Sequence, residues 1–417
     1  MSLTKYKLGE LAQLHTIGVS PCAGTIYKLY SLPSFDNGKQ REIVDGVQIQ
    51  SNKYSVPDKC ILFNKLNVRF KRVWCINNTA INKLCSTEFL PLVVNEDKVD
   101  YRYFYYLLIS DRITNYLCGQ NTNTSGSHKR IDTTDFLNID VALPEISVQR
   151  HIGETLSDID RKIELNRAIN QNLEVMAKQL YDYWFVQFDF PNEEGIPYKS
   201  SGGKMVWNEK LQKEVPEGWN VVYVNDIAEV FNGATPSTTD EQNYGGNIVW
   251  ITPKDLSDQK QKFIYQGERN ISQKGYDSCS THLLPPNTIL MSSRAPIGLL
   301  AIAKKELCTN QGFKSFVPTK ANISTYLYYY LKVHIKQIEQ LGTGTTFKEV
   351  SREDVLKFPI LKPHDSTLNL WEKTASALNE RQLEIQKENE SLTKQRDELL
   401  PLLMNGQVSV NSDLSVH

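Results

Sequence analysis

Four cationic side chains lie within eight residues of this sequence: Lys65, Arg69, Lys71 and Arg72. They belong to a β-rich run, ILFNKLNVRFKRVW (residues 61–74). Such a cluster can neutralise phosphates, and each contact made would steepen the salt dependence of binding. A solvated strand face has the same composition and is the alternative.

Two short polar segments offer a second kind of phosphate contact. Small residues and glycine leave backbone N–H groups accessible to an anion, although a simple turn would have the same composition. The first segment supplies Ser125, Gly126, His128, Lys129 and Arg130, and the second, 219 residues later, supplies Gly344, Thr345, Thr346 and Lys348.

A third group carries side chains that can read base edges. Arg294, which follows Ser292 and Ser293, and the pair Asn310 and Gln311 can bond bidentately to guanine or adenine in the major groove. A purely structural role is the alternative for each. Lys254 and Lys314 complete the candidate DNA contacts.

Catalytic motifs are scarce. The nearest approach to a nuclease carboxylate set is Pro57-Asp58 with Glu96-Asp97-Lys98, a loose pattern that arises by chance in chains of this length. The sequence has no phosphate-binding loop, no dinucleotide fingerprint, no H-E-x-x-H and no metal-spaced Cys/His cluster, so we predict no catalytic and no metal-binding residues. The aromatic runs 103–106 and 326–330 could stack on bases, but their helical spacing favours core packing. The pattern indicates a protein that positions chemistry performed elsewhere.

The segments that would position these residues occur twice in the sequence, as an internal repeat. HKRIDTTDFLNIDVALPE (128–145) aligns with FKEVSREDVLKFPILKPH (347–364) at an offset of 219. LGELAQL (8–14) aligns with VNDIAEV (224–230) at 216, and YFYYLLI (103–109) with YLYYYLK (326–332) at 223. Residues 20–90 and 235–320 show no likeness. The chain is therefore a tandem repeat with a shared scaffold and different inserts.

Each repeat ends in a long segment whose apolar residues recur at steps of three and four, the spacing of a coiled-coil seam. We expect the two helices to pair antiparallel and act as a ruler; separate amphipathic helices lying on their own domains are the alternative. Gln382 and Arg396 depart from the apolar pattern. The predicted seam residues are Leu156, Ile159, Ile163, Asn170, Leu173, Leu180, Leu378, Ile385, Asn389, Leu392 and Leu399.

These patterns predict an α+β fold with six segments. They are a mixed α/β region (1–145), a central helix (146–190), a linker (191–205), a second mixed region (206–363), a C-terminal helix (364–406) and a loose tail (407–417).

Composition sets broader limits. The chain has 417 residues and a formal net charge of −1, with mildly basic mixed regions and acidic helical regions. It has no long apolar run and no signal-peptide pattern. Its seven cysteines are widely spaced, which indicates reduced thiols and a cytoplasmic location.

The sequence resembles the specificity subunits of type I restriction-modification systems along nearly its whole length. The resemblance rests on the run at 61–74, and on FNGATPSTTDEQNYGGNIVWITPKDL (231–256), LMSSRAPIGLLAI (290–302), TNQGFKSF (309–316), QRHIGETLSDIDRKIELN (149–166) and LLPLLMNGQ (399–407).

That resemblance implies two target recognition domains in a pseudo-two-fold arrangement, separated by antiparallel coiled-coil helices. Each domain would read one half of an asymmetric bipartite DNA target, and the helices would set the gap. Two methyltransferase (M) subunits would dock on the helices, and two restriction (R) subunits would join them. S-adenosylmethionine, ATP and Mg²⁺ would be used by these partners, with no cofactor bound by this chain.

Two other classes of function stay open from the residues alone. A self-contained nuclease or methyltransferase would need motifs that the sequence lacks. A coiled-coil scaffold joining two protein-binding domains would show no salt-sensitive DNA binding.

Overall fold

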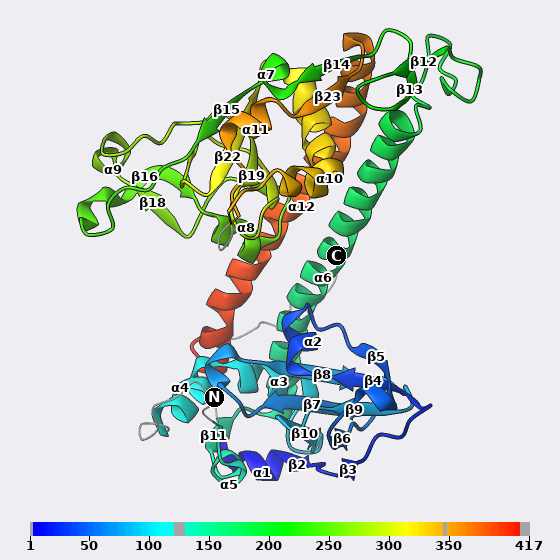
Figure 1. The fold of residues 1–417 in the computed structure, drawn as a ribbon. Coiled ribbons are helices and arrows are strands. Elements are labelled where there is room, and N and C mark those ends of the chain that lie inside the picture. The colour runs from blue at the N-terminus through cyan, green and yellow to red at the C-terminus, as the bar shows by residue number, and fades with distance from the viewer. Residues whose placement is uncertain (1–2, 121–129, 345–347, 409–417) are drawn as a thin grey trace, which may run out of the picture. The chain divides into compact units, whose positions relative to one another are not determined.

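The structure, a computed structural model, describes residues 3–120, 130–344 and 348–408 (Figure 1). Its contacts divide the chain into two compact units, Met1–Arg167 with Glu388–His417, and Ala168–Lys387. Each unit combines helices with sheets, which confirms the predicted α+β class. The division cuts both long helices, whereas the predicted domain limits fall at their ends. The reason is packing: Leu156 and Leu403 belong to the core of the first unit, and Ala177 and Trp371 to that of the second.

The first unit contains three sheets, with strand orders β1-β11, β2-β10-β7-β8 and β3-β6-β9-β4-β5. Its strands are β1 (Thr4–Lys7), β2 (Ala12–Leu14), β3 (Gly18–Val19), β4 (Ile26–Tyr30), β5 (Glu42–Asp45), β6 (Lys53–Ser55), β7 (Lys59–Asn64), β8 (Val73–Asn77), β9 (Lys83–Cys85), β10 (Phe89–Val94) and β11 (Asp140–Leu143). Its short helices are α1 (Leu8–Leu11), α2 (Leu32–Asp36), α3 (Tyr101–Ile109), α4 (Asp111–Gln120) and α5 (Thr133–Leu137).

The second unit contains sheets β14-β23, β15-β22-β19-β20-β17, β18-β16-β21 and the hairpin β12-β13. Its strands are β12 (Met205–Asn208), β13 (Lys213–Pro216), β14 (Asn220–Tyr223), β15 (Ala228–Asn232), β16 (Tyr244–Ile251), β17 (Phe263–Ile264), β18 (Arg269–Ile271), β19 (Ile289–Ser292), β20 (Leu300–Ala303), β21 (Cys308–Thr309), β22 (Phe313–Pro318) and β23 (Pro359–Lys362). Its short helices are α7 (Val224–Ile227), α8 (Pro253–Gln259), α9 (Gln273–Asp277), α10 (Ser324–Gln340) and α11 (Arg352–Leu356).

The two units repeat the same strand pairings in the same register. The offsets of 216 and 219 found in the sequence apply to the first of these ladders, and the inner ladders keep the same pairing at offsets of 224 and 228, so the same scaffold is built twice. The pair Thr4–Leu143 of the first unit matches Asn220–Lys362 of the second. Likewise, Ala12–Val94 matches Ala228–Pro318, and Asn64–Phe89 matches Ser292–Phe313.

Local capping explains where the repeated helices begin. The carboxylate of Asp132 accepts hydrogen bonds from the first turn of α5, and the Ser351 hydroxyl does so for α11. These two residues are 219 apart in the repeat, and both types are preferred N-caps. The aromatic runs pack into the cores, as their spacing predicted: Tyr103, Tyr106, Tyr326 and Tyr329 are buried.

The long helices are α6 (Ile146–Tyr181), followed by a π-helical turn (Asp182–Val186), and α12 (Asp365–Met404). The predicted end of the first helix at residue 190 is wrong, because Phe188 takes a left-handed φ of 67° that breaks the helical turn.

The predicted linker 191–205 is an ordered segment. Asp189 accepts hydrogen bonds from the backbone N–H and the hydroxyl of Ser200, at 2.7 and 2.6 Å. Phe190 stacks on Tyr198 and on Trp219, with ring centroids 4.7 and 4.9 Å apart. Aromatic packing and these hydrogen bonds therefore fix the conformation of the connection between α6 and β12.

Candidate nucleic-acid interface

The predicted cationic cluster of the first unit lies in the connection between β7 and β8. Asn64, at the end of β7, is 2% exposed, and its side-chain oxygen accepts a hydrogen bond from the backbone N–H of Leu66 at 2.9 Å. Asn67 and Lys71 take left-handed φ angles of 51° and 45°. The buried amide and these two turn positions hold the connection in a defined loop.

Two of the four cations in this loop are already paired. Arg72 donates two hydrogen bonds to Asp36 at 2.7 and 2.8 Å, and Lys71 pairs with Asp111 at 2.6 Å. Arg69 is exposed, with its guanidinium 4.9 Å from the ring centre of Phe70. Within the described residues, neither Lys65 nor Arg69 has a carboxylate partner. These two charges are the ones available to a phosphate.

The second predicted segment meets the first at this loop. Ser125, Gly126, His128 and Lys129 lie outside the described residues. Arg130 forms a β-bridge with Leu66, and the N–H of Ile131 donates to the carbonyl of Lys65 at 3.0 Å. Arg130 also bonds to both carboxylate oxygens of Glu88, at 3.0 and 2.5 Å. We call residues 64–72 with 130–131 the first edge.

The second unit builds the same arrangement between β19 and β20. The N–H of Val350 donates to the carbonyl of Ser293 at 3.0 Å, and Arg294 forms a β-bridge with Glu349. The N–H of Ser293 donates to the carbonyl of Gly312 at 2.8 Å, as the N–H of Lys65 does to that of Glu88 at 2.9 Å. Residues 292–299 with 349–350 are the second edge.

Burial removes three predicted contacts from the second edge. Ser292 and Ser293 are fully buried, and the Ser292 hydroxyl donates to the Pro296 carbonyl at 2.6 Å while accepting from the N–H of Leu299 at 2.8 Å. The Lys314 side chain is 6% exposed and pairs with Glu349 at 3.3 Å. These residues stabilise the loop and the predicted direct contacts by them are wrong in this conformation. Sequence alone could not tell which face of the strand they occupy.

Arg294 remains half-exposed at the surface of the second edge, where Glu349 accepts a hydrogen bond from its Nε at 2.9 Å. Glu349 is a residue that the prediction missed, although the repeat alignment placed it opposite Arg130. The charge at this position is therefore reversed between the two edges.

The other predicted contacts are spread over the second unit. Asn310 accepts from the N–H of Gly312 at 2.9 Å, and Gln311 accepts from the hydroxyl of Thr235. Lys254, on α8, pairs with Glu268 at 2.8 Å, and both are about two-thirds exposed. Gly344, with a φ of 117°, and Lys348 are exposed; Thr345 and Thr346 lie outside the described residues.

Every predicted seam residue of α6 and α12 is buried or half-buried. In the first unit, Arg396 donates to Asp160 at 2.8 Å, and Tyr106 donates to the same carboxylate at 2.7 Å. In the second unit, Asn170 and Gln382 exchange side-chain to backbone hydrogen bonds at 3.1 and 3.3 Å. The polar residues that interrupt the seam thus bond across it.

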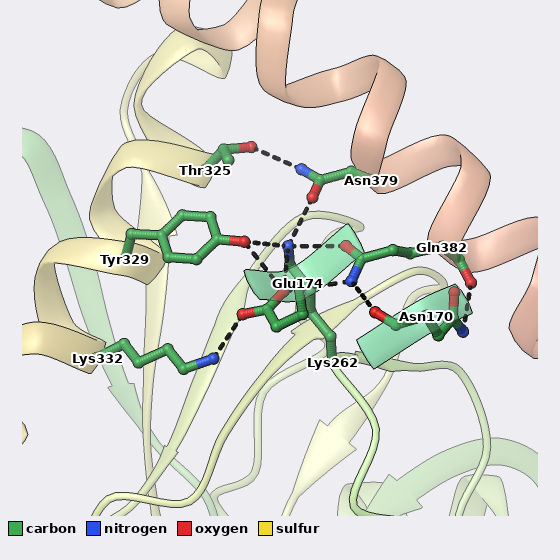
Figure 2. A network of polar contacts seen from close by, with 8 residues as sticks. All are labelled: Asn170, Glu174, Lys262, Thr325, Tyr329, Lys332, Asn379 and Gln382. Carbon is green, nitrogen blue, oxygen red and sulfur yellow. Dashed lines mark hydrogen bonds and ion pairs between the residues drawn. The ribbon is translucent and has the colours of Figure 1, made fainter. Parts of the chain in front are cut away.

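Lys262 is the centre of a buried polar network in the second unit (Figure 2), which no motif or spacing in the sequence predicted. Burial lowers the pKa of its ammonium to about 8, while Glu174 acts in the opposite direction. Burial disfavours the ionised form of Glu174, but Lys262 and Lys332 outweigh this and hold the pKa of its carboxyl below the usual value.

One face of α6 and of the π-helical turn that follows it carries exposed apolar side chains at seven-residue intervals in the second unit. They are Ile169, Met176 and Tyr183, with relative exposures of 44%, 54% and 37%. Residues seven apart share a helix face, so these side chains form one apolar stripe.

In the part of the chain that the structure describes, no group of His, Cys, Asp or Glu could hold a metal ion. Nor does any helix among those residues have the length and apolar character needed to cross a membrane.

Comparison with known proteins gives the family. The sequence matches the type I restriction modification DNA specificity domain over residues 3–175 and 216–392. The HindI specificity subunit of Haemophilus influenzae is 26% identical over 400 residues, covering 84% of this chain and 86% of the relative. The MjaIX specificity subunit of Methanocaldococcus jannaschii is 42% identical over 152 residues, which are 36% of this chain and 35% of that relative.

Among solved structures, the type I restriction-modification S subunit from M. genitalium has the same fold. It aligns over 97% of this chain and 96% of its own, with a TM-score of 0.58 and 15% identity. The chain therefore belongs to the type I restriction-modification DNA specificity family, whose specificity subunits are the non-catalytic, DNA-recognising components of these systems.

Proposed function

We propose that each unit of this specificity subunit reads one half of a bipartite DNA target through its edge. The proposal rests on one observation: both units build the same hydrogen-bonded loop, but the two loops carry different side chains. Two DNA-reading sites of different specificity require a common backbone scaffold that presents different side chains at its edge.

The target is asymmetric, because the two edges differ in the groups that they present. The first edge offers Lys65 and Arg69, which have no carboxylate partner among the described residues, whereas the second offers Arg294 beside Glu349. A carboxylate accepts hydrogen bonds and repels phosphate, whereas an arginine donates and attracts it. Two such edges cannot favour the same half-site.

The helices α6 and α12 pair as an antiparallel coiled coil in a pseudo-two-fold arrangement and set the gap between the half-sites. The contacts between the two helices within each unit support this pairing. Asp160 contacts Arg396, Asn166 contacts Glu388 and Asn170 contacts Gln382, so residue numbers rise along α6 while they fall along α12.

Two methyltransferase subunits dock on the helical region, and the apolar stripe of α6 (Ile169, Met176 and Tyr183) is one of the surfaces that they cover. Such exposed apolar surface is typical of an interaction site. Two restriction subunits complete the assembly. S-adenosylmethionine, ATP and Mg²⁺ are used by these partners, and this chain provides the DNA sequence specificity.

The test is to co-express the chain with its methyltransferase subunit and map N6-methyladenine across the host DNA. One asymmetric, bipartite motif with a fixed gap is the expected result, and methyltransferase without this chain is the control that should leave the DNA unmodified. Unmodified DNA despite a stable complex would instead favour a scaffold that joins two protein-binding domains.

A further inference from the structure

Lys262 comes from the part of the second repeat that has no likeness to the first, yet its side chain lies among the shared helices. It follows α8 and directly precedes β17. The N–H of Ile302 donates to its carbonyl at 2.8 Å, and the amide of Gln386 on α12 donates to the Phe263 carbonyl at 2.9 Å. The backbone at this point is therefore held from both the sheet and the helix.

The ammonium of Lys262 contacts three different helices (Figure 2). It lies 3.1 Å from Glu174 Oε2 on α6 and 2.7 Å from the hydroxyl of Tyr329 on α10. On α12 it lies 2.7 Å from Asn379 Oδ1 and 3.1 Å from Gln382 Oε1. One side chain thus joins the insert without a repeat counterpart to α6, α10 and α12.

The surroundings of this ammonium complete the network. Glu174 also pairs with Lys332 at 2.5 Å, and the Tyr329 hydroxyl donates to Glu174 Oε2 at 3.0 Å. The Lys262 side chain is only 7% exposed. A buried charge is tolerated only where its partners are correctly placed, so displacing the insert from the helices would leave both Lys262 and Glu174 poorly satisfied.

Among the residues that the structure describes, the first unit has no lysine bonded to three helices at the equivalent place. Lys39 follows α2 as Lys262 follows α8, and it also approaches the tyrosines of the neighbouring helix. The residue is exposed overall, although desolvation of the ammonium lowers the pKa of Lys39, and this ammonium donates a single 3.3 Å hydrogen bond, to Tyr105, within the described residues. The buried junction is therefore a property of the second unit.

We propose that Lys262 is a positioning residue that locks the second recognition insert onto α6, α10 and α12, and so fixes the position at which the second half-site is read. This inference rests on the proposed function. Changing the gap by one base pair moves a half-site by about 3.4 Å along the duplex and rotates it by about 35°. A rigid junction resists that displacement, and a loosened one tolerates it.

The experiment measures DNA affinity of the complex reconstituted with methyltransferase subunits, on duplexes that carry both mapped half-sites at the preferred gap and at one base pair more or less. Wild type should discriminate against the altered gaps by about 5-fold or more, within the usual range of coupling between sites. Lys262→Met should reduce this to about 2-fold, while affinity for a duplex with the second half-site alone stays unchanged.

Three variants sharpen the test. Gln382→Ala removes one acceptor on α12 and keeps the ion pair with Glu174, so it should also weaken gap discrimination and serves if Lys262→Met does not fold. Lys39→Met changes the equivalent lysine of the first unit, and Lys332→Met removes the other cation beside Glu174 without detaching the insert. Both should keep the discrimination of the wild type.

The outcomes separate the two proposals. If Lys262→Met and Gln382→Ala keep full gap discrimination, or lose affinity equally at every gap, Lys262 has no positioning role. If wild type itself shows no dependence on the gap, the proposed bipartite function is wrong and the role of Lys262 falls with it.

Discussion

Arg130 and Glu349 occupy the same position of the two repeats and carry opposite charges. Each closes a β-bridge to the loop of its edge, with Leu66 and Arg294 respectively. Arg130 is held by Glu88, whereas Glu349 holds Arg294 and Lys314. An ion pair therefore forms at this position in both repeats, with the repeat residue as the cation in the first edge and as the anion in the second.

Removing the carboxylate from the second edge should strengthen nonspecific DNA binding. Glu349→Gln frees Arg294, which is half-exposed, to contact a phosphate, and one added contact steepens the slope of log K against log salt by about 0.9. Fluorescence anisotropy over a salt series measures this slope. Glu217→Gln, which frees Lys204 beside the β12-β13 hairpin, is the matched control and should keep the slope of the wild type. An unchanged slope in Glu349→Gln would show that Arg294 does not reach DNA.

Two arginines of the first edge, Arg69 and Arg72, should affect the salt dependence of DNA binding differently. Arg69→Ala should weaken DNA binding and reduce the salt slope by about 0.9, because one phosphate contact is lost. Arg72→Ala should leave the slope nearly unchanged, since Arg72 is already bonded to Asp36. Equal slopes for the two variants in the same salt series would contradict this assignment.

The proposed role of the helices in setting the gap can be tested by lengthening them without disturbing the contacts within either unit. An insertion after Asn170 would move Glu174 away from Lys262, so four residues are better inserted in both helices, after Arg167 and before Glu388, where the two units divide. Four residues add about 6 Å, and at about 3.4 Å per base pair the mapped gap should grow by one or two pairs. Altered half-sites with an unchanged gap would refute the ruler.

Lys262 should make stability rise with pH in a defined window. Its folded pKa of about 8 lies below the value of about 10.4 for an unfolded chain. Between these values the unfolded state holds a proton that the native state has released, so unfolding becomes harder as pH rises. From pH 7 to 9.5, wild type should gain about 1 to 2 kcal/mol relative to Lys262→Met in urea unfolding.

That window avoids the other titrations of the network. Glu174 loses its contribution only as pH falls below the ordinary range of a carboxyl, and burial raises the pKa of Tyr329 far above it. A difference between wild type and Lys262→Met that does not change with pH would mean that the lysine is not desolvated as the structure shows.

A charge in the apolar stripe of α6 should release the methyltransferase subunit. Met176→Glu places a carboxylate at the middle of the stripe, and burying an unpaired charge at an interface costs several kcal/mol. The affinity for the subunit should fall about 10-fold or more, measured by calorimetry. Gln171→Glu adds the same charge at another exposed position of α6 and should bind normally; equal losses would exclude the stripe as the contact.

The repeated scaffold of strands and helices could be predicted because its sequence occurs twice in the chain. The offsets at Leu8, Tyr103 and Pro144 align segments whose strand registers and helix caps coincide in the structure. The helical period likewise identified residues that are buried along α6 and α12. Repetition and periodicity are local in sequence, so one chain suffices to detect them.

The candidate site was harder, because its residues come from distant segments. Sequence placed Arg130 and Lys65 in separate groups, and only folding brings them to one edge. It took Lys314 for a surface cation although Glu349 neutralises it in the interior. Ion pairing of this kind depends on strand neighbours that no spacing rule reveals, and Lys262 lies in a segment without any repeat partner.

The packing of Leu403 has a consequence for how the protein is made. This side chain near the end of α12 is 3% exposed within the first core, beside residues such as Leu8 and Phe104. The ribosome delivers Leu403 long after those residues, whereas residues 168–387 contain the whole second unit. During synthesis, the half that emerges first is therefore the last to close, and a product cut short before residue 388 would expose an apolar surface that proteases and chaperones can recognise.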